Sequence, residues 1–139
     1  MADRTFTIIK PDSVEKGNSG EILTRLEKEG FKILGLKKLR LSPPQAEAFY
    51  GVHRDRPFFK DLVRYMTSGP VYVAALERQD AVPHLRKVMG ATDPAKAEPG
   101  TVRKEFGESI ERNAIHGSDS PENANIEVHF FFAESELLQ

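Results

Sequence analysis

The sequence predicts an α+β fold with a ferredoxin-like split β-α-β core, in which an antiparallel four-stranded sheet carries helices on one face and has extra helices inserted. β-rich segments and segments of helical periodicity follow one another in the order β-α-β-α-α-β-α-β. The connections are short, apart from a long loop around residues 90–100 that is rich in Gly and Pro. No repeat or Gly/Ser-rich linker divides the 139 residues, so we expect a single domain over residues 1–139.

Four segments have the composition of strands. The first is β-rich and stops at Pro11, the second alternates apolar and polar residues, and the last two are apolar runs. They are Arg4 to Lys10, Phe31 to Leu41, Val71 to Leu76 and Ile126 to Phe132.

The predicted helices are marked by their first residues. Asn18, followed three residues later by Glu, resembles a capping box, and Ser42 before two prolines and a glutamine is a strong helix start. Asp80 and Thr101 are expected to cap two later helices.

A helix after Pro57 has a core stripe of Phe59, Leu62, Val63 and Met66 at helical spacing. Phe58 lies about 100° away from that stripe around the helix. A large aromatic side chain off the core face is unexplained by packing but suits stacking on a nucleobase.

Composition excludes several classes of function. The formal net charge is −1, whereas proteins that act mainly on nucleic acid usually carry a basic excess. There is no cysteine, which excludes disulfides and thiol nucleophiles. There is no apolar signal region, no long apolar run, no phosphate-binding P-loop motif and no protein-kinase H-R-D motif. We therefore expect a cytoplasmic protein that acts neither at a membrane nor mainly on nucleic acid.

The segment N-A-I-H-G-S-D-S, residues 113–120, is the most informative motif. An uncharged imidazole is a nucleophile toward phosphorus, and an unperturbed imidazole is mostly uncharged at neutral pH. Gly117 allows a positive φ or a close approach of a ligand, and Ser118 and Ser120 supply hydrogen bonds. The alternative for His116 is a solvent-facing histidine in a polar turn.

A scattered set of groups suited to phosphate accompanies this motif: Lys10, Arg86, Thr92 and Arg103. Each has a structural alternative. Lys10 could be a solvated cation at a strand end, Arg86 could line a helix edge, Thr92 could cap a loop and Arg103 could be a surface charge.

Six blocks in the same order resemble the nucleoside diphosphate kinase family. The resemblance runs from Thr5 almost to the C-terminus. The blocks are I-I-K-P-D (8–12), R-P-F-F (56–59), S-G-P-V (68–71), M-G-A-T-D-P (89–94), P-G-T-V-R (99–103) and N-A-I-H-G-S-D-S (113–120).

The resemblance implies roles for the catalytic group. His116 corresponds to the histidine that is phosphorylated on Nδ1, and Glu127 to the carboxylate that holds its other ring nitrogen. Ser118 corresponds to the hydroxyl tied to that carboxylate, Lys10 to the lysine near the γ-phosphate and the ribose 3′-hydroxyl, and Tyr50 to the phenol beside the transferred group. Taken by themselves, Tyr50 suits a core position equally well and Glu127 suits a water-facing place in a strand.

The resemblance also implies nucleotide contacts. Arg86, Thr92 and Arg103 correspond to ligands of the β- and γ-phosphates, and Asn113, otherwise an ordinary turn residue, to a ribose contact. The base slot would be formed by Phe58, Leu62 and Ile110.

The implied activity is transfer of the γ-phosphoryl group from a nucleoside triphosphate, mainly ATP, to nucleoside diphosphates. The expected mechanism is ping-pong through phosphohistidine at His116, with low base specificity. Mg²⁺ is expected as a cofactor that the nucleotide phosphates hold, with no metal site of the protein's own, and a homo-oligomer, tetramer or hexamer, is expected. Two rivals are a catalytically inactive scaffold and a nucleic-acid-binding module that uses the aromatics of residues 130–132 on a strand.

Overall fold

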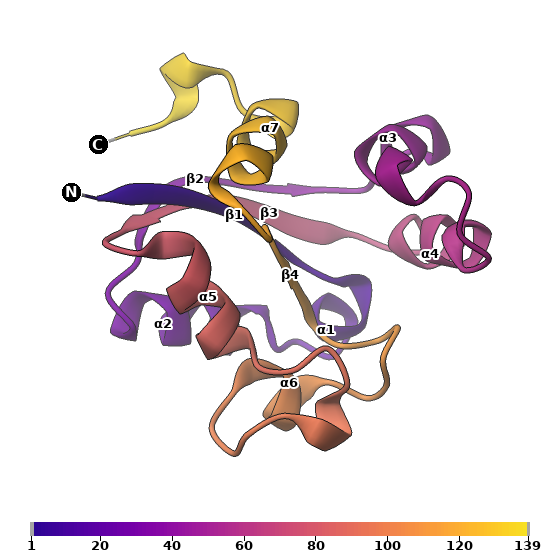
Figure 1. The fold of residues 1–139 in the computed structure, drawn as a ribbon, viewed down its shortest axis with the longest axis horizontal. Coiled ribbons are helices and arrows are strands. Elements are labelled where there is room, and N and C mark those ends of the chain that lie inside the picture. The colour runs from indigo at the N-terminus through magenta and orange to yellow at the C-terminus, as the bar shows by residue number, and fades with distance from the viewer. Residues whose placement is uncertain (1, 139) are drawn as a thin grey trace.

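The computed structural model describes residues 2–138 and contains an antiparallel four-stranded sheet with the strand order β2-β3-β1-β4. This confirms the predicted α+β class with its four-stranded sheet (Figure 1). The strands are β1 (Asp3–Ile9), β2 (Lys32–Leu39), β3 (Val71–Arg78) and β4 (Ile115–Gly117). The central strand β1 pairs along its whole length with β3 and at its end with β4, where Ile8 lies opposite His116.

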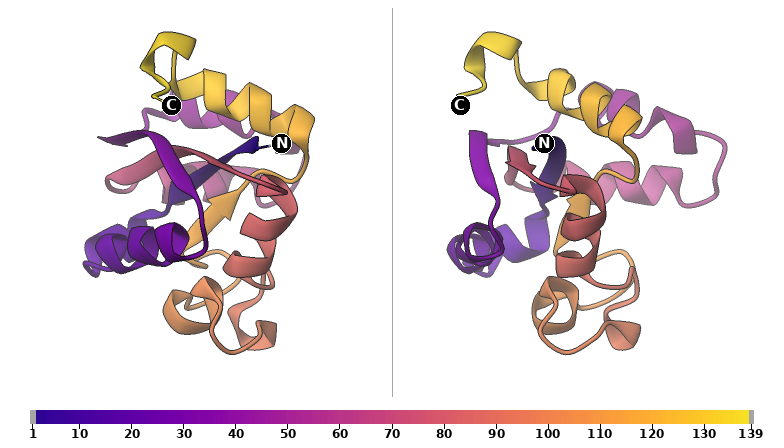
Figure 2. Two further views of the ribbon diagram at one scale, coloured as in Figure 1. Left: turned by 90° about the vertical axis from the view of Figure 1, so that its left-hand side faces the viewer. Right: turned by 60° about the vertical axis from the view of Figure 1, so that its left-hand side comes forward.

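Helices cover both faces of the sheet, not one face as the sequence suggested (Figures 1 and 2). One core is shared by the sheet with α2 and α5, and the other by the sheet with α3, α4 and α7. Because both faces are covered, β1 is buried continuously from Thr5 to Ile9. The helices are α1 (Pro11–Glu15), α2 (Ser19–Lys28), α3 (Pro43–Phe49), α4 (Phe59–Met66), α5 (Ala81–Met89), α6 (Val102–Phe106) and α7 (Pro121–Phe131).

The predicted strand over residues 126–132 is wrong, because residues 126–131 belong to helix α7 and Phe132 is its C-cap. Ser120 caps the helix by accepting a hydrogen bond from the backbone N of Asn123 at 3.1 Å, and Pro121 occupies its first turn. Ala124 and Val128, four residues apart, are the buried positions on its inner face. The fourth strand of the sheet is instead the three-residue β4, inside the histidine motif.

Two of the predicted caps are confirmed and two are wrong. Ser42 forms the full capping box with Gln45, and Thr101 accepts a hydrogen bond from the backbone N of Lys104. Asn18 has helical backbone angles and Asp80 is left-handed at φ 54°, and neither side chain caps its helix. Within residues 2–138, no helix is long and apolar enough to cross a membrane.

Candidate active site

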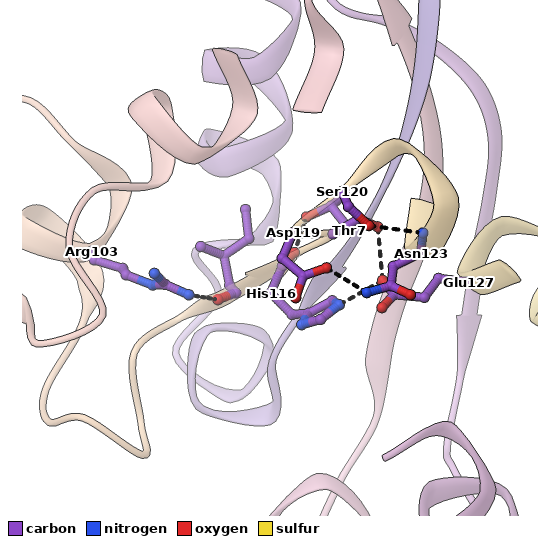
Figure 3. Close-up of polar contacts among 9 residues, drawn as sticks. Thr7, Arg103, His116, Asp119, Ser120, Asn123 and Glu127 are labelled. Carbon is purple, nitrogen blue, oxygen red and sulfur yellow. Dashed lines mark hydrogen bonds and ion pairs between the residues drawn. The ribbon is translucent and has the colours of Figure 1, made fainter. Parts of the chain in front are cut away.

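His116 lies in the middle of β4, at the edge of the sheet, where the strand is held from both sides (Figure 3). On the β1 side, the hydroxyl of Thr7 donates to the His116 carbonyl oxygen at 2.7 Å. On the other side, Nη2 of Arg103 donates to the Ile115 carbonyl oxygen at 2.9 Å. The backbone that carries the imidazole is therefore fixed by two side chains that flank the short strand.

The imidazole of His116 is oriented by a carboxylate. Its Nε2 lies 2.9 Å from Oε1 of Glu127, and the Ser118 hydroxyl donates to the same oxygen at 2.7 Å. An ionised carboxylate only accepts hydrogen bonds, so Nε2 carries the proton and Nδ1 is left with a free lone pair. Nδ1 of His116 makes no hydrogen bond to any residue between positions 2 and 138. Of the two ring nitrogens, Nδ1 is therefore the one whose lone pair is not engaged by the described residues.

Glu127 reaches His116 from helix α7, not from a strand as its local sequence suggested. Glu127 therefore lies on a different element from the one expected, but its contact with His116 is present. Helix α7 packs over β1 and directs this side chain toward β4. The two side chains are only 20% and 19% exposed, which strengthens the interaction between them.

Aromatic rings border the His116 ring on its other sides. Ring centroids of Phe49, Phe6 and Tyr50 lie 5.6, 6.2 and 6.3 Å from its own. Tyr50 fits both of its alternatives, since it is buried in the core and also borders His116. Its hydroxyl is buried without a partner in the described part of the chain, and burial, followed by the charge of Glu127, raises its pKa.

Lys10 is a buried cation directed at the histidine motif, not a solvated strand-end charge. Its Nζ donates to Oδ1 of Asn113 at 2.7 Å, and Nδ2 of Asn113 donates to the Thr92 carbonyl oxygen at 3.1 Å. Burial, and then the nearby cation of Arg103, lowers the pKa of Lys10 to about 8. The predicted phosphate and ribose ligands Lys10, Asn113 and Thr92 therefore form one connected group.

Arg103 is also buried, so it is not one more surface charge. Burial, and then repulsion from Arg86, lowers its pKa to about 10. Arg86 and Thr92 are exposed, and with Arg103 they line an open pocket of about 830 Å³ between α5 and the following loop. His116 and Lys10 do not line it, so the pocket covers only part of the predicted phosphate site.

The predicted base slot presents apolar surface to solvent. Phe58 is 44% and Ile110 59% exposed, whereas Leu62 packs partly against the core. Helix α4 and the Ile110 loop approach each other where the guanidinium of Arg112 lies 5.2 Å from the centre of the Tyr65 ring. The arrangement leaves exposed apolar groups on both segments.

Gly117 does not have the positive φ that its sequence allowed. A Cβ here would lie 2.5 Å from Sδ of Met89 and 3.0 Å from Leu85. The glycine therefore lets β4 pack closely against α5. The left-handed residue in the motif is Ala114, at φ 75°.

Sequence reasoning missed several residues that hold the site in place. Thr7, Asp12 and Tyr65 make hydrogen bonds to the motif or to one another over separations of 53 to 109 residues. No local pattern reveals such contacts. The sequence carries one signal for them, since Asp12 belongs to the block I-I-K-P-D, although the block by itself assigns no role to this aspartate.

The family model described as "Nucleoside diphosphate kinase" matches residues 3–137. The chain belongs to the nucleoside diphosphate kinase family. A nucleoside diphosphate kinase of Geobacter sulfurreducens is 56% identical over 136 residues, covering 98% of this chain and 99% of that protein, and one of Campylobacter lari is 55% identical with the same coverage.

Solved nucleoside diphosphate kinases have the same fold. The enzyme of Aquifex aeolicus superposes with a TM-score of 0.97 at 47% identity, covering 99% of this chain and 100% of that one. The enzyme of Halobacterium salinarum, in complex with CDP, gives 0.95 at 42% identity, covering 100% and 93%. The chain therefore has nucleoside diphosphate kinase activity and is a phosphotransferase. The rival nucleic-acid module loses its main support, because Phe130 and Phe131 lie on α7 and not on the sheet.

Proposed function

We propose that the chain transfers the γ-phosphoryl group of a nucleoside triphosphate to a nucleoside diphosphate through a phosphohistidine at His116. One observation carries the proposal: Glu127 holds Nε2 of a partly exposed imidazole and leaves Nδ1 free. Nδ1 attacks the γ-phosphorus, the bond from phosphorus to the bridging oxygen breaks, and the diphosphate leaves with that oxygen. A second diphosphate then takes the phosphoryl group by the reverse step, which makes the kinetics ping-pong.

Phosphoryl transfer needs positioning and neutralisation of charge more than covalent help. Lys10, Arg86 and Arg103 are the cations that would face the β- and γ-phosphates, and the buried Lys10 and Arg103 are held by hydrogen bonds. Fixed cations in a partly buried site stabilise developing charge without having to reorganise. Asn113 and Thr92 would bind the ribose and a phosphate, and Tyr50 would border the transferred group.

Mg²⁺ fits this site as a companion of the nucleotide. Among residues 2–138 no three His, Asp or Glu side chains are grouped to hold an ion, so the phosphate oxygens would hold it. When bound there, it neutralises phosphate charge. The side chains of this protein orient the nucleotide and supply the remaining positive charge.

Low base specificity follows from the exposed apolar groups of the base slot. Phe58 and Ile110 offer stacking and apolar contact, which every base satisfies. The related enzyme of Halobacterium salinarum was solved with CDP, which supports nucleoside diphosphates as ligands here. ATP would be the main donor. A preference for one base above about a thousandfold would exceed stacking differences of a few kcal/mol and would contradict this part of the proposal.

The experiment that tests the proposal is incubation with γ-labelled ATP and Mg²⁺. The protein should become labelled, and the label should be acid-labile and base-stable, as phosphohistidine is. His116→Ala should abolish both labelling and transfer, whereas His129→Ala, which removes an exposed histidine of α7, should leave both intact. Labelling that persists in His116→Ala, or intersecting lines in initial-rate plots, would remove His116 from this role, and an unlabelled wild-type protein would favour the inactive scaffold.

The resemblance also suggests the state of the protein in the cell. We propose a cytoplasmic homo-oligomer, either tetramer or hexamer, built from single-domain chains. Light scattering coupled to size exclusion distinguishes these masses from that of a 15.6 kDa monomer.

A further inference from the structure

The backbone of Ala114 is strained, and it lies within the motif that carries the reactive histidine. Its φ of 75° is in the left-handed region, which residues other than glycine rarely adopt. Such a conformation persists only where the surrounding structure fixes it. Ala114 directly follows Asn113 and lies two residues before His116, so its conformation sets the relative placement of both side chains.

The first turn of helix α1, from its N-cap Lys10 to Asp12, holds both polar backbone groups of Ala114. Its N–H donates to Oδ2 of Asp12 at 3.1 Å, and its carbonyl oxygen accepts from the backbone N of Lys10 at 2.9 Å. Asp12 is 3% exposed and Ala114 is fully buried, so water does not compete for these bonds. The carboxylate of Asp12 therefore binds the strained backbone of Ala114 directly.

The other oxygen of Asp12 connects the turn to helix α4. Oδ1 accepts a hydrogen bond from the Tyr65 hydroxyl, whose oxygen in turn accepts from the backbone N of Asp12 at 3.1 Å. Tyr65 lies on the helix that carries Leu62 and begins just after Phe58. Asp12 thus joins three segments of the site: the turn with Lys10, the helix of the base slot and the strand with His116.

We propose that Asp12 is a positioning residue for phosphoryl transfer, which holds Ala114 left-handed and thereby sets Asn113 and His116 relative to Lys10. It touches none of the reacting atoms. This inference rests on the proposed phosphohistidine at His116. A misplacement of about 1 Å in an otherwise intact site costs about 100-fold in rate, so the effect belongs to the rate of transfer more than to nucleotide affinity.

The test compares three variants in single-turnover labelling of His116 at saturating ATP and Mg²⁺. Asp12→Ala should lower the rate about 100-fold while the affinity for ADP changes only several-fold. Asp12→Asn keeps an oxygen that can accept from the Ala114 N–H, and should retain at least about ten times the rate of Asp12→Ala. Ala114→Gly in the Asp12→Ala background should recover a substantial part of the rate, because glycine adopts φ 75° without strain.

Two controls separate positioning from a loss of stability. Ala114→Gly alone should stay within a few-fold of wild type. Ile22→Val, on the buried face of α2, should lower the melting temperature without slowing labelling. All rates are measured well below the lowest melting temperature of the set. The proposal is overturned if Asp12→Ala labels at the wild-type rate, or if its loss is the same with Gly and Ala at position 114. Either result leaves the phosphohistidine mechanism standing, whereas only failure to label the wild-type protein at His116 would remove that.

Discussion

Glu127 orients the His116 ring from a helix and makes no contact with the phosphoryl group in the proposed mechanism. Glu127→Ala should therefore lower kcat by at least about 100-fold with little change in KM, because the ring loses the partner that fixes its tautomer. Ser118→Ala should cost less, since it removes one donor to the carboxylate and leaves the carboxylate on the ring. Steady-state kinetics measures both, and Glu122→Ala, an exposed glutamate of the same helix, serves as the control. A Glu127→Ala enzyme with raised KM and unchanged kcat would contradict the orienting role.

Lys10 gives the reaction a pH dependence with a defined sign. Its pKa is about 8 in the free protein, so the cation is lost as pH rises through that value. The ratio kcat/KM reports the free enzyme and should fall above about pH 8, whereas bound phosphates raise the pKa of Lys10 and should keep kcat level to higher pH. In Lys10→Arg, whose guanidinium does not titrate in this range, the fall near pH 8 should disappear, although the activity is lower throughout. Persistence of the same fall in Lys10→Arg would assign it to another group.

The same pKa of Lys10 predicts how stability varies with pH. The folded value of about 8 lies below the ordinary 10.5, so between these values the unfolded chain binds more protons than the folded one. The contribution of Lys10 to the free energy of unfolding is therefore unfavourable below pH 8, rises between pH 8 and 10.5, and is no longer a cost above that window. Urea unfolding of wild type and Lys10→Met at pH 7.5 and pH 10 measures it. The free energy of unfolding of Lys10→Met minus that of wild type should be larger at pH 7.5 than at pH 10. Equal values of this difference at the two pH values would contradict the burial of a charged Lys10.

At the scale of elements, the site depends on the close packing of β4 against α5. Gly117→Ala places a methyl group against the side chains of Met89 and Leu85, so these side chains must shift or the strand with His116 must move away from the helix with Arg86. We expect a loss of about 1–3 kcal/mol in the free energy of unfolding, together with slower labelling of His116. Gly20→Ala, in α2 with nothing within 4 Å of the added methyl, is the control and should stabilise by about 0.5–1 kcal/mol. Equal stability of the two variants would show that β4 tolerates displacement.

Elements with strong local signals could be predicted, and those set by distant contacts could not. The Ser42 capping box was readable because all of its partners lie within three residues. Ser120–Pro121 carries the same start signal, but the apolar, β-branched and aromatic run after it favoured a strand. The three residues of β4 are too short to show periodicity, and only pairing with β1 makes them a strand. The predicted site residues nevertheless form two hydrogen-bonded groups, Lys10 with Asn113 and Thr92, and His116 with Glu127 and Ser118. All of these except Glu127 lie in the family blocks, which identified them without the local structure.

In the molecule as a whole, the two halves of the proposed nucleotide site lie on separate projections from the sheet. Figure 1 shows α3 and α4 at one end of the sheet and α6 with its flanking loops below it. Phe58 belongs to the first projection and Ile110 to the second, with His116 on the strand between them. A nucleotide that stacks on Phe58 and reaches the cations of the second projection would bridge the two. Binding should therefore stabilise the whole chain.

If the nucleotide bridges the two projections, the rise in melting temperature on ADP binding should depend on Ile110 and not on the similarly exposed Ile126. At an ADP concentration of about 100 times Kd with Mg²⁺, the free energy of unfolding should rise by about 2.7 kcal/mol and the melting temperature by on the order of 10 °C. Ile110 is 59% exposed in the second projection and Ile126 is 64% exposed on α7, so truncating either should change the free protein little. Ile110→Ala should weaken binding by about 1 kcal/mol, roughly fivefold, because apolar area that the base would cover is lost. At the same ADP concentration its stabilisation should then fall to about 1.8 kcal/mol. Ile126→Ala should keep the full shift. Since the two variants lose the same methyl groups at similarly exposed positions, equal shifts would show that Ile110 does not contact the base, and the base slot would reduce to Phe58 and Leu62 on the first projection alone.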